Sequence, residues 1–155
     1  MPTQITNDQQ LREALNSLTP QQQRELGGLY VSNVSHLSDD PRISRAVEAA
    51  AKSDISPQEL EDTYKSVKSF ATQSYTACGQ DADWGAQAEH FVAAAATACL
   101  AQEDQSGSKA NSAWKAAMQA RMAKNCEMIQ KDEGELANEA EKQYRIAENY
   151  LNGGN

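Results

Sequence analysis

The chain has 155 residues, of which 39% are hydrophobic and 6% aromatic, and its formal net charge is -8. This length suits one domain with a core of its own, and abundant Ala, Gln and Glu beside few aromatic residues favour helix over sheet. The negative charge disfavours binding to nucleic acid or to anionic membranes. We therefore predict an all-α, compact single-domain bundle of five to seven helices spanning residues 1–155.

The excess acid is concentrated in the middle of the chain. Residues 53–107 hold nine acidic residues and only Lys65 and Lys68 as bases, whereas the segments on either side are close to neutral. The simplest interpretation is a solvated face that keeps the protein soluble. The alternative is an acidic surface that docks a basic protein partner.

The first two helices are predicted from capping residues and apolar spacing. We expect residues 1–6 to be disordered and a short helix over 7–17, with Asn7 or Asp8 as its cap. Thr19 followed by Pro20 predicts the next helix start. The core residues expected for this second helix are Leu26, Leu29, Tyr30, Val34 and Leu37.

Two adjacent glycines, Gly27 and Gly28, lie inside the second predicted helix. Glycine in a helix interior costs about 1 kcal/mol relative to alanine, so a pair of them calls for a compensating role. The apolar period continues through the pair without interruption. We therefore expect close helix packing here and not a kink.

Two further proline-marked starts follow. Pro41, after Ser38-Asp39-Asp40, predicts a third helix that ends near Ser53. Ser56 and Pro57 predict a fourth, which Gly79 is suited to end. The core face expected for the fourth helix consists of Leu60, Tyr64, Val67, Phe70 or Ala71, and Ser74.

An alanine-rich stretch dominates the next predicted helix, at about 83–103, with Asp81 or Asp83 as its cap. Within 91–101 the sole polar residue is Thr97, and none is charged. A helix that is apolar all round is buried on all sides. We therefore predict that this helix is the central one, with the others packed around it.

The rest of the chain predicts one long helix over 109–150 and a disordered tail at 152–155. A straight helix of that length would span about 60 Å, about twice the width of a domain this size. We therefore expect a kink or break at 131–135, around Gly134. Its expected apolar side consists of Trp114, Met118, Met122, Ile129, Leu136, Ala140, Tyr144, Ala147 and Leu151.

The sequence offers little catalytic chemistry. Its two histidines, His36 and His90, stand in no metal-binding or nucleophile motif, and no phosphate-binding glycine loop is found. The three cysteines are widely spaced, which does not suit a disulfide framework. We expect His90 and Cys99 to be structural, no metal or cofactor, and, since no signal segment is visible, a cytoplasmic location.

The leading functional hypothesis is a non-enzymatic helical protein that binds another protein, as an adaptor, an inhibitor or an immunity-type binder. Its partner would be a basic protein or a second copy of the chain in a homodimer, with Met128, Tyr144 and Tyr150 as candidate contacts. One alternative is a ligand-binding protein or enzyme with a cavity beside the alanine-rich helix. The candidate lining of that cavity is Trp84, Phe91 and Trp114. Another alternative is a helical oligomer with a structural role.

Overall fold

The capping residues predicted from the sequence for the first two helices form hydrogen bonds at the starts of those helices. In a computed structural model, which describes residues 3–78, 84–101, 111–131 and 139–153, the Thr19 hydroxyl accepts the Gln22 amide and the Gln22 side chain accepts the Thr19 amide. Pro20 is the first residue of that helix. The Asn7 side chain caps the first helix by accepting the Gln10 amide at 2.8 Å. The predicted starts of these helices are confirmed.

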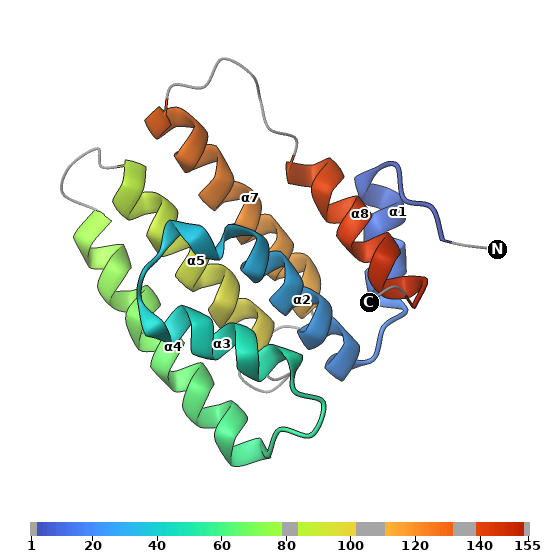
Figure 1. The fold of residues 1–155 in the computed structure, drawn as a ribbon, viewed down its shortest axis with the longest axis horizontal. Helices are drawn as coiled ribbons and strands as arrows, with labels where there is room; N and C mark the ends of the chain where they lie inside the picture. The colour runs from blue at the N-terminus through green and yellow to red at the C-terminus, as the bar shows by residue number, and fades with distance from the viewer. Residues whose placement is uncertain (1–2, 79–83, 102–110, 132–138, 154–155) are drawn as a thin grey trace.

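The described residues form seven α-helices and one 3₁₀ turn, with no strand among them (Figure 1). Their bounds are α1 Asp8–Asn16, α2 Pro20–Val34, η1 Ser35–Leu37, α3 Pro41–Ala51, α4 Pro57–Cys78, α5 Trp84–Leu100, α7 Ser112–Lys131 and α8 Glu139–Leu151. The predicted all-α bundle is confirmed. Gly79 and the proposed caps Asp81 and Asp83 lie outside the described residues.

The alanine-rich helix α5 is central, as predicted. It contacts α2, α3, α4 and α7, and Figure 1 shows it enclosed among them. Small side chains let these neighbours come close to its axis. A Cβ built on Gly27 of α2 would lie 2.9 Å from the Cβ of Cys99, and one built on Gly28 would lie 2.6 Å from the Cβ of Ala50 in α3. The predicted close packing at the two glycines is confirmed.

Two hydrophobic cores share the helices α2 and α7. The larger core joins these two helices to α3, α4 and α5, and the smaller one joins them to α1, α8 and Ile5. In α2, Val31 and Val34 face the larger core, whereas Leu26 and Tyr30 face the smaller one. Both helices therefore bury two faces, and α1 with α8 forms an extra layer on one side of the bundle.

The C-terminal segment predicted as a helix over 109–150 with a kink or break at 131–135 forms two helices. Helix α7 ends at Lys131, the first residue of the predicted break, and α8 begins at Glu139. Figure 1 shows α8 running back beside α1 and α2 and not continuing the axis of α7. Because α8 folds back, Ala147 is buried in the smaller core. A straight continuation of α7 would leave Ala147 in water. Gly134 lies outside the described residues.

Four expectations about exposure were wrong. Leu29, Met122 and Ile129 were assigned to core faces, yet they are 44%, 45% and 51% exposed. Met128 was expected off the core stripe and is instead buried, at 7% exposure. Each lies on α2 or α7, where two buried faces replace the single stripe that the prediction assumed.

The predicted disorder of residues 1–6 does not hold for the part that the structure describes. Ile5 is fully buried in the smaller core, and its amide donates to the Glu148 carboxylate of α8 at 2.7 Å. The Thr3 amide donates to the Asn152 side chain at 2.8 Å. The start of the chain is thus fastened to the end of α8, a pairing of residues more than 140 positions apart.

Candidate functional site

A surface groove of about 600 Å³ runs along α2, between α8 and the end of α3. Figure 1 shows α2 lying between these two helices. The groove is lined by Glu25, Leu29, Ser32, Asn33, Ala51, Ile146, Asn149 and Tyr150. Its size falls in the range of binding sites that accept a ligand or a few side chains.

The floor of the groove is the face of α2 that neither core uses. Leu26, Tyr30 and Val34 turn inward to the cores, which leaves Leu29 on the outside at 44% exposure. Leu29 is therefore an exposed aliphatic side chain in a concave setting. Ile146 of α8 lines the same groove and also packs against the smaller core. A partner that covers apolar surface of this kind removes it from water, which lowers the free energy of the complex.

Two hydrogen bonds hold α8 at the two ends of the groove. The Tyr150 hydroxyl donates to Glu25 Oε1 at 2.9 Å, and Asn33 Nδ2 donates to Glu139 Oε2 at 2.6 Å. Because Glu25 pairs near the end of α8 and Asn33 at its start, the two helices run antiparallel. Burial, followed by the bond to Glu25, raises the pKa of Tyr150 to about 12, so this hydroxyl remains a donor at neutral pH.

A polar junction on the inner side of α8 fixes its position. Arg121 of α7 makes two bonds to the Asp8 carboxylate, at 2.7 and 3.0 Å, and a third to Gln143 at 2.8 Å. Gln143, fully buried, donates to the Ala117 carbonyl, and the Tyr144 hydroxyl donates to Asp8. The bonds from Arg121 lower the pKa of Asp8. These polar contacts, together with the packing of α8 in the smaller core, position the wall that α8 forms.

The three residues predicted to contact a partner lie in three different places in the fold. Tyr150 lines the groove, whereas Tyr144 belongs to the polar junction and Met128 is buried. Sequence reasoning missed Leu29 and Ile146 as surface residues. The signal for Leu29 was present, since α2 carries apolar residues on more sides than one core face can use. Ile146 becomes a groove residue only because α8 folds back, which residue spacing does not encode.

The predicted cavity residues Trp84, Phe91 and Trp114 are not among the residues that line the groove. Trp84 is 37% exposed at the start of α5, and Phe91 packs against the larger core. Trp114 packs against the smaller core, where the guanidinium groups of Arg12 and Arg121 lie 5.0 and 5.8 Å from its ring. Over the alanine-rich part of α5, the side chains of Ala93, Ala95, Ala96 and Cys99 are buried in the larger core.

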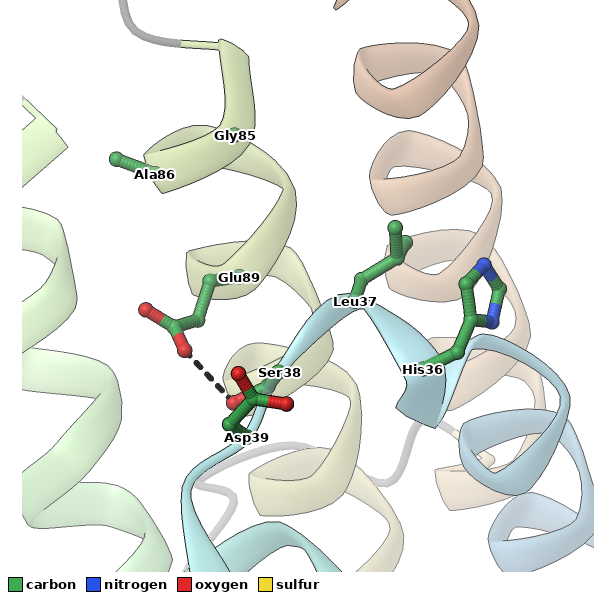
Figure 2. A pocket seen from close by; sticks show the side chains of 7 residues that line it. All are labelled: His36, Leu37, Ser38, Asp39, Gly85, Ala86 and Glu89. Carbon is green, nitrogen blue, oxygen red and sulfur yellow. Dashed lines mark hydrogen bonds between the residues drawn. The ribbon is translucent and has the colours of Figure 1, made fainter.

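A hollow of about 390 Å³ does lie beside the first turns of α5, with a different lining (Figure 2). Ser38 donates to the Glu89 carboxylate there at 2.8 Å. Figure 2 shows the His36 ring turned away from Ser38, toward α7. His36 Nε2 lies instead 2.8 Å from the buried Glu127 carboxylate, which also lies 2.6 Å from Lys124 Nζ. Ser38 therefore has no histidine base within reach for nucleophilic chemistry.

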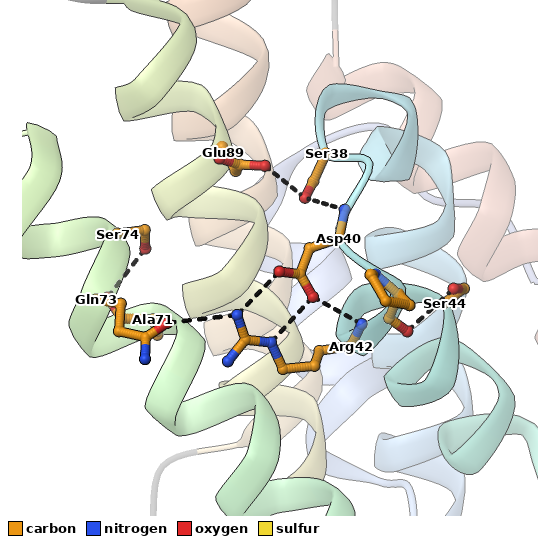
Figure 3. A network of polar contacts seen from close by, with 9 residues as sticks. Ser38, Asp40, Arg42, Ser44, Ala71, Gln73, Ser74 and Glu89 are labelled. Carbon is orange, nitrogen blue, oxygen red and sulfur yellow. Dashed lines mark hydrogen bonds and ion pairs between the residues drawn. The ribbon is translucent and has the colours of Figure 1, made fainter.

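The polar network around Ser38 and Asp40 fastens the turn before α3 to its neighbours (Figure 3). The Ser38 hydroxyl accepts the Asp40 amide, and Asp40 forms a two-bond pair with Arg42 at 2.9 Å for each bond. Arg42 also reaches Gln73 of α4 and lies 4.6 Å above the ring of Phe70. Bonding to Arg42 lowers the pKa of Asp40. Each of these polar groups has a structural partner.

His90 pairs with Ser74, but not as a catalytic couple. Its Nδ1 lies 3.0 Å from the Ser74 hydroxyl and 3.2 Å from the Ala71 carbonyl. A carbonyl only accepts, so Nδ1 carries the proton and donates, while Ser74 donates to the same carbonyl. Burial lowers the pKa of His90. Nδ1 thus cannot take a proton from Ser74, and the pair fastens α5 to α4.

Two of the three cysteines, Cys99 and Cys126, have side chains that the structure describes. Cys99 and Cys126 are both buried, and burial raises the pKa of Cys99 to about 12, which leaves its thiol protonated and unreactive. The described part of the chain brings no three His, Cys, Asp or Glu side chains together as a metal site. Nor does any helix within it have the length and apolar character needed to cross a membrane.

The groove along α2 is therefore the feature of the described surface that best suits binding. Its floor presents Leu29 at 44% exposure, whereas the polar clusters elsewhere among the described residues serve packing. Comparison of the chain with protein-family models, with curated proteins and with solved structures gave no match.

Proposed function

We propose that this chain is a non-enzymatic protein-binding protein, of the adaptor, inhibitor or immunity type, which receives its partner in the groove along α2. The observation that carries the proposal is the 44% exposure of Leu29 on the floor of a groove of about 600 Å³. An exposed leucine in a concave setting presents apolar surface that a partner can remove from water.

The polar chemistry of the chain supports binding over catalysis. Ser38, Ser74 and His90 all donate or accept within structural networks, and none of them forms a nucleophile with a base aligned to deprotonate it. The groove itself is lined by one carboxylate, from Glu25, and by neutral side chains. Such a lining offers contacts to a partner but no acid–base pair for a reaction.

The acidic middle of the chain gives a weaker basis for docking. Glu59 pairs with Lys52 at 3.1 Å, and Glu61 with Lys65 at 3.5 Å. Four of the nine acidic residues of this segment lie outside the described residues: Asp81, Asp83, Glu103 and Asp104. A basic partner would gain on-rate from the overall charge of -8, while the groove would supply the apolar contact.

The test is affinity capture with a matched pair of variants. Full-length wild type, Leu29→Glu and Ile129→Glu are immobilised, exposed to extract from the producing cells, and the retained proteins are quantified by mass spectrometry. Ile129 is a fair control because it is an exposed aliphatic residue of similar accessibility, 51%, on α7. Circular dichroism and urea unfolding check that all three variants are folded.

We expect at least one protein to be retained by wild type and by Ile129→Glu, and to be reduced about tenfold or more on Leu29→Glu, since truncating or charging an anchor costs about 2 kcal/mol or more. Equal retention on Leu29→Glu would refute the groove as the binding site. Loss on Ile129→Glu alone would move the site to α7. If wild type retains nothing specific, the proposed binding function is wrong.

A further inference from the structure

We infer that the occupant of the groove is an amphipathic helical segment of another protein, with apolar side chains against Leu29 and Ile146 and a basic side chain toward Glu25. This inference rests on the proposed function, because it names the partner of the same groove. It is carried by the shape of the groove and by the distribution of charge around it.

The shape of the groove suits a helix. Its floor is α2, and its walls are α8 and the last residue of α3, so an added helix would pack on α2 as α3 and α8 do. The two bonded pairs that bound it on α2, at Glu25 and Asn33, are eight residues apart, which corresponds to about 12 Å, or two helical turns.

An extended strand is a poorer occupant. Strand addition requires a free sheet edge with unpaired backbone groups, and the described residues contain only helices. The walls of the groove instead present side chains. Apolar residues at i, i+3, i+4 and i+7 of an incoming helix would place one narrow stripe along Leu29 and Ile146, the usual arrangement for a helix bound in a groove.

The charge of the lining selects against acidic occupants. Glu25 is the one charged residue among the eight that line the groove, and none of them is a base. Its carboxylate accepts from Tyr150 at 2.9 Å and from Gln21 at 2.8 Å, which leaves further acceptor capacity on an ionised carboxylate. A Lys or Arg at the edge of the incoming helix would complete this cluster.

The same argument disfavours a second copy of this chain. Each copy carries a net charge of -8, so two copies repel one another at low ionic strength. A second copy would also bring another Glu25 toward the groove region instead of the base that Glu25 lacks. A basic helix of a different protein therefore fits both the apolar floor and the charge.

The experiment is selection from a display library of amphipathic helical peptides of about sixteen residues, a length at which isolated helices begin to be stable. Apolar positions repeat at i, i+3, i+4 and i+7, and the remaining positions are randomised. The library is depleted on Leu29→Glu and then selected on the wild-type chain. Selected peptides are synthesised and titrated by fluorescence anisotropy against wild type, Glu25→Gln and Glu13→Gln.

The two glutamine variants are a matched pair. Glu13 of α1, like Glu25 of α2, accepts from a glutamine four residues earlier, but it lies outside the groove. Glu25→Gln keeps one acceptor oxygen for the Tyr150 hydroxyl, removes the charge, and replaces the oxygen that accepts from Gln21 by an amide NH2 group. We expect selected peptides to be enriched in Lys or Arg at one edge of the apolar stripe, and Glu25→Gln to weaken them about fivefold while Glu13→Gln leaves affinity unchanged.

Selected peptides without a basic preference, or affinity unchanged in Glu25→Gln, would overturn the inference. So would a selection that yields no Leu29-dependent peptide, or a concentration-dependent dimer that is lost in Leu29→Glu by light scattering. These outcomes are distinct from failure of the proposed function. If the extract yields a Leu29-dependent protein while no helical peptide binds, the groove is a binding site and its occupant has another chemistry.

Discussion

The closest approach between helices in this fold yields a sharp prediction. A methyl group added at Gly28 of α2 would lie 2.6 Å from the Cβ of Ala50 in α3, a separation at which one of the two helices must move. Ala50 cannot turn away, because its methyl is fixed to the backbone and it is fully buried. We therefore expect Gly28→Ala to destabilise the protein, although alanine is the better helix former.

The magnitude follows from two opposed terms. Overpacking of a filled core costs about 1–3 kcal/mol. Replacing glycine by alanine in a helix interior stabilises the helix by about 1 kcal/mol. The expected net loss is about 1 kcal/mol, which for a chain of this size lowers the melting temperature by about 2–4 °C. Ser32, exposed on the same helix, measures the propensity term alone through the difference between Ser32→Gly and Ser32→Ala.

A double-mutant cycle separates contact from propensity. Ala50→Gly alone should cost about 1 kcal/mol by propensity. In Gly28→Ala with Ala50→Gly, the methyl group has moved from one helix to the other, so the clash is relieved and stability should return close to that of wild type. The expected coupling is therefore about 2 kcal/mol, measured by urea unfolding followed by circular dichroism. A stabilising Gly28→Ala with additive effects would refute the close approach of α2 and α3.

Three further predictions concern buried polar groups. The Tyr30 hydroxyl is buried without a partner among the described residues, so Tyr30→Phe should be neutral or stabilise by about 1 kcal/mol in urea unfolding; a loss above about 1 kcal/mol would show that the hydroxyl is satisfied. Burial lowers the pKa of His90 from its ordinary 6.5, so the unfolded chain binds the proton more tightly than the folded chain does. Folding stability therefore falls as the pH drops below about 6.5. His90→Gln should flatten this fall, and an unchanged profile of stability against pH would contradict the prediction. Burial raises the pKa of Glu139 above its ordinary 4.5, although the hydrogen bond from Asn33 opposes the shift. The contribution of Glu139 to folding stability is therefore present below pH 4.5 and is lost as the pH rises through the pKa of the folded state. Glu139→Gln should therefore gain stability relative to wild type between about pH 5 and pH 8, and a variant that loses stability over that range would refute this assignment.

Local chemistry explains what the sequence predicted well. Thr19 and Pro20 begin α2 because a cap and a proline act on their own neighbours, whatever the rest of the chain does. The alanine-rich stretch is central because no face of it can be given to water. Gly27 and Gly28 could be assigned to close packing because the apolar period of the helix runs through them.

The failures have a common cause in contacts that are distant in sequence. Ile5 could not be recognised as buried, because its partner Glu148 lies 143 residues away. Leu29 and Ile129 were placed in the core because the helix period was interpreted as one buried stripe, whereas α2 and α7 each face two cores. A helix with two buried faces has no clear apolar side, so its remaining exposed residues are assigned poorly from spacing alone.

These failures also explain why the groove exists. The layer formed by α1 and α8 packs on α2 and α7 through the smaller core, and Arg121, Gln143 and Asn33 add polar bonds around it. Directional bonds hold α8 at discrete points and do not require it to close onto α2 along its length. The space between those points leaves Leu29 uncovered. A fold that fastened α8 by apolar packing alone would have buried this leucine and lost the groove with it.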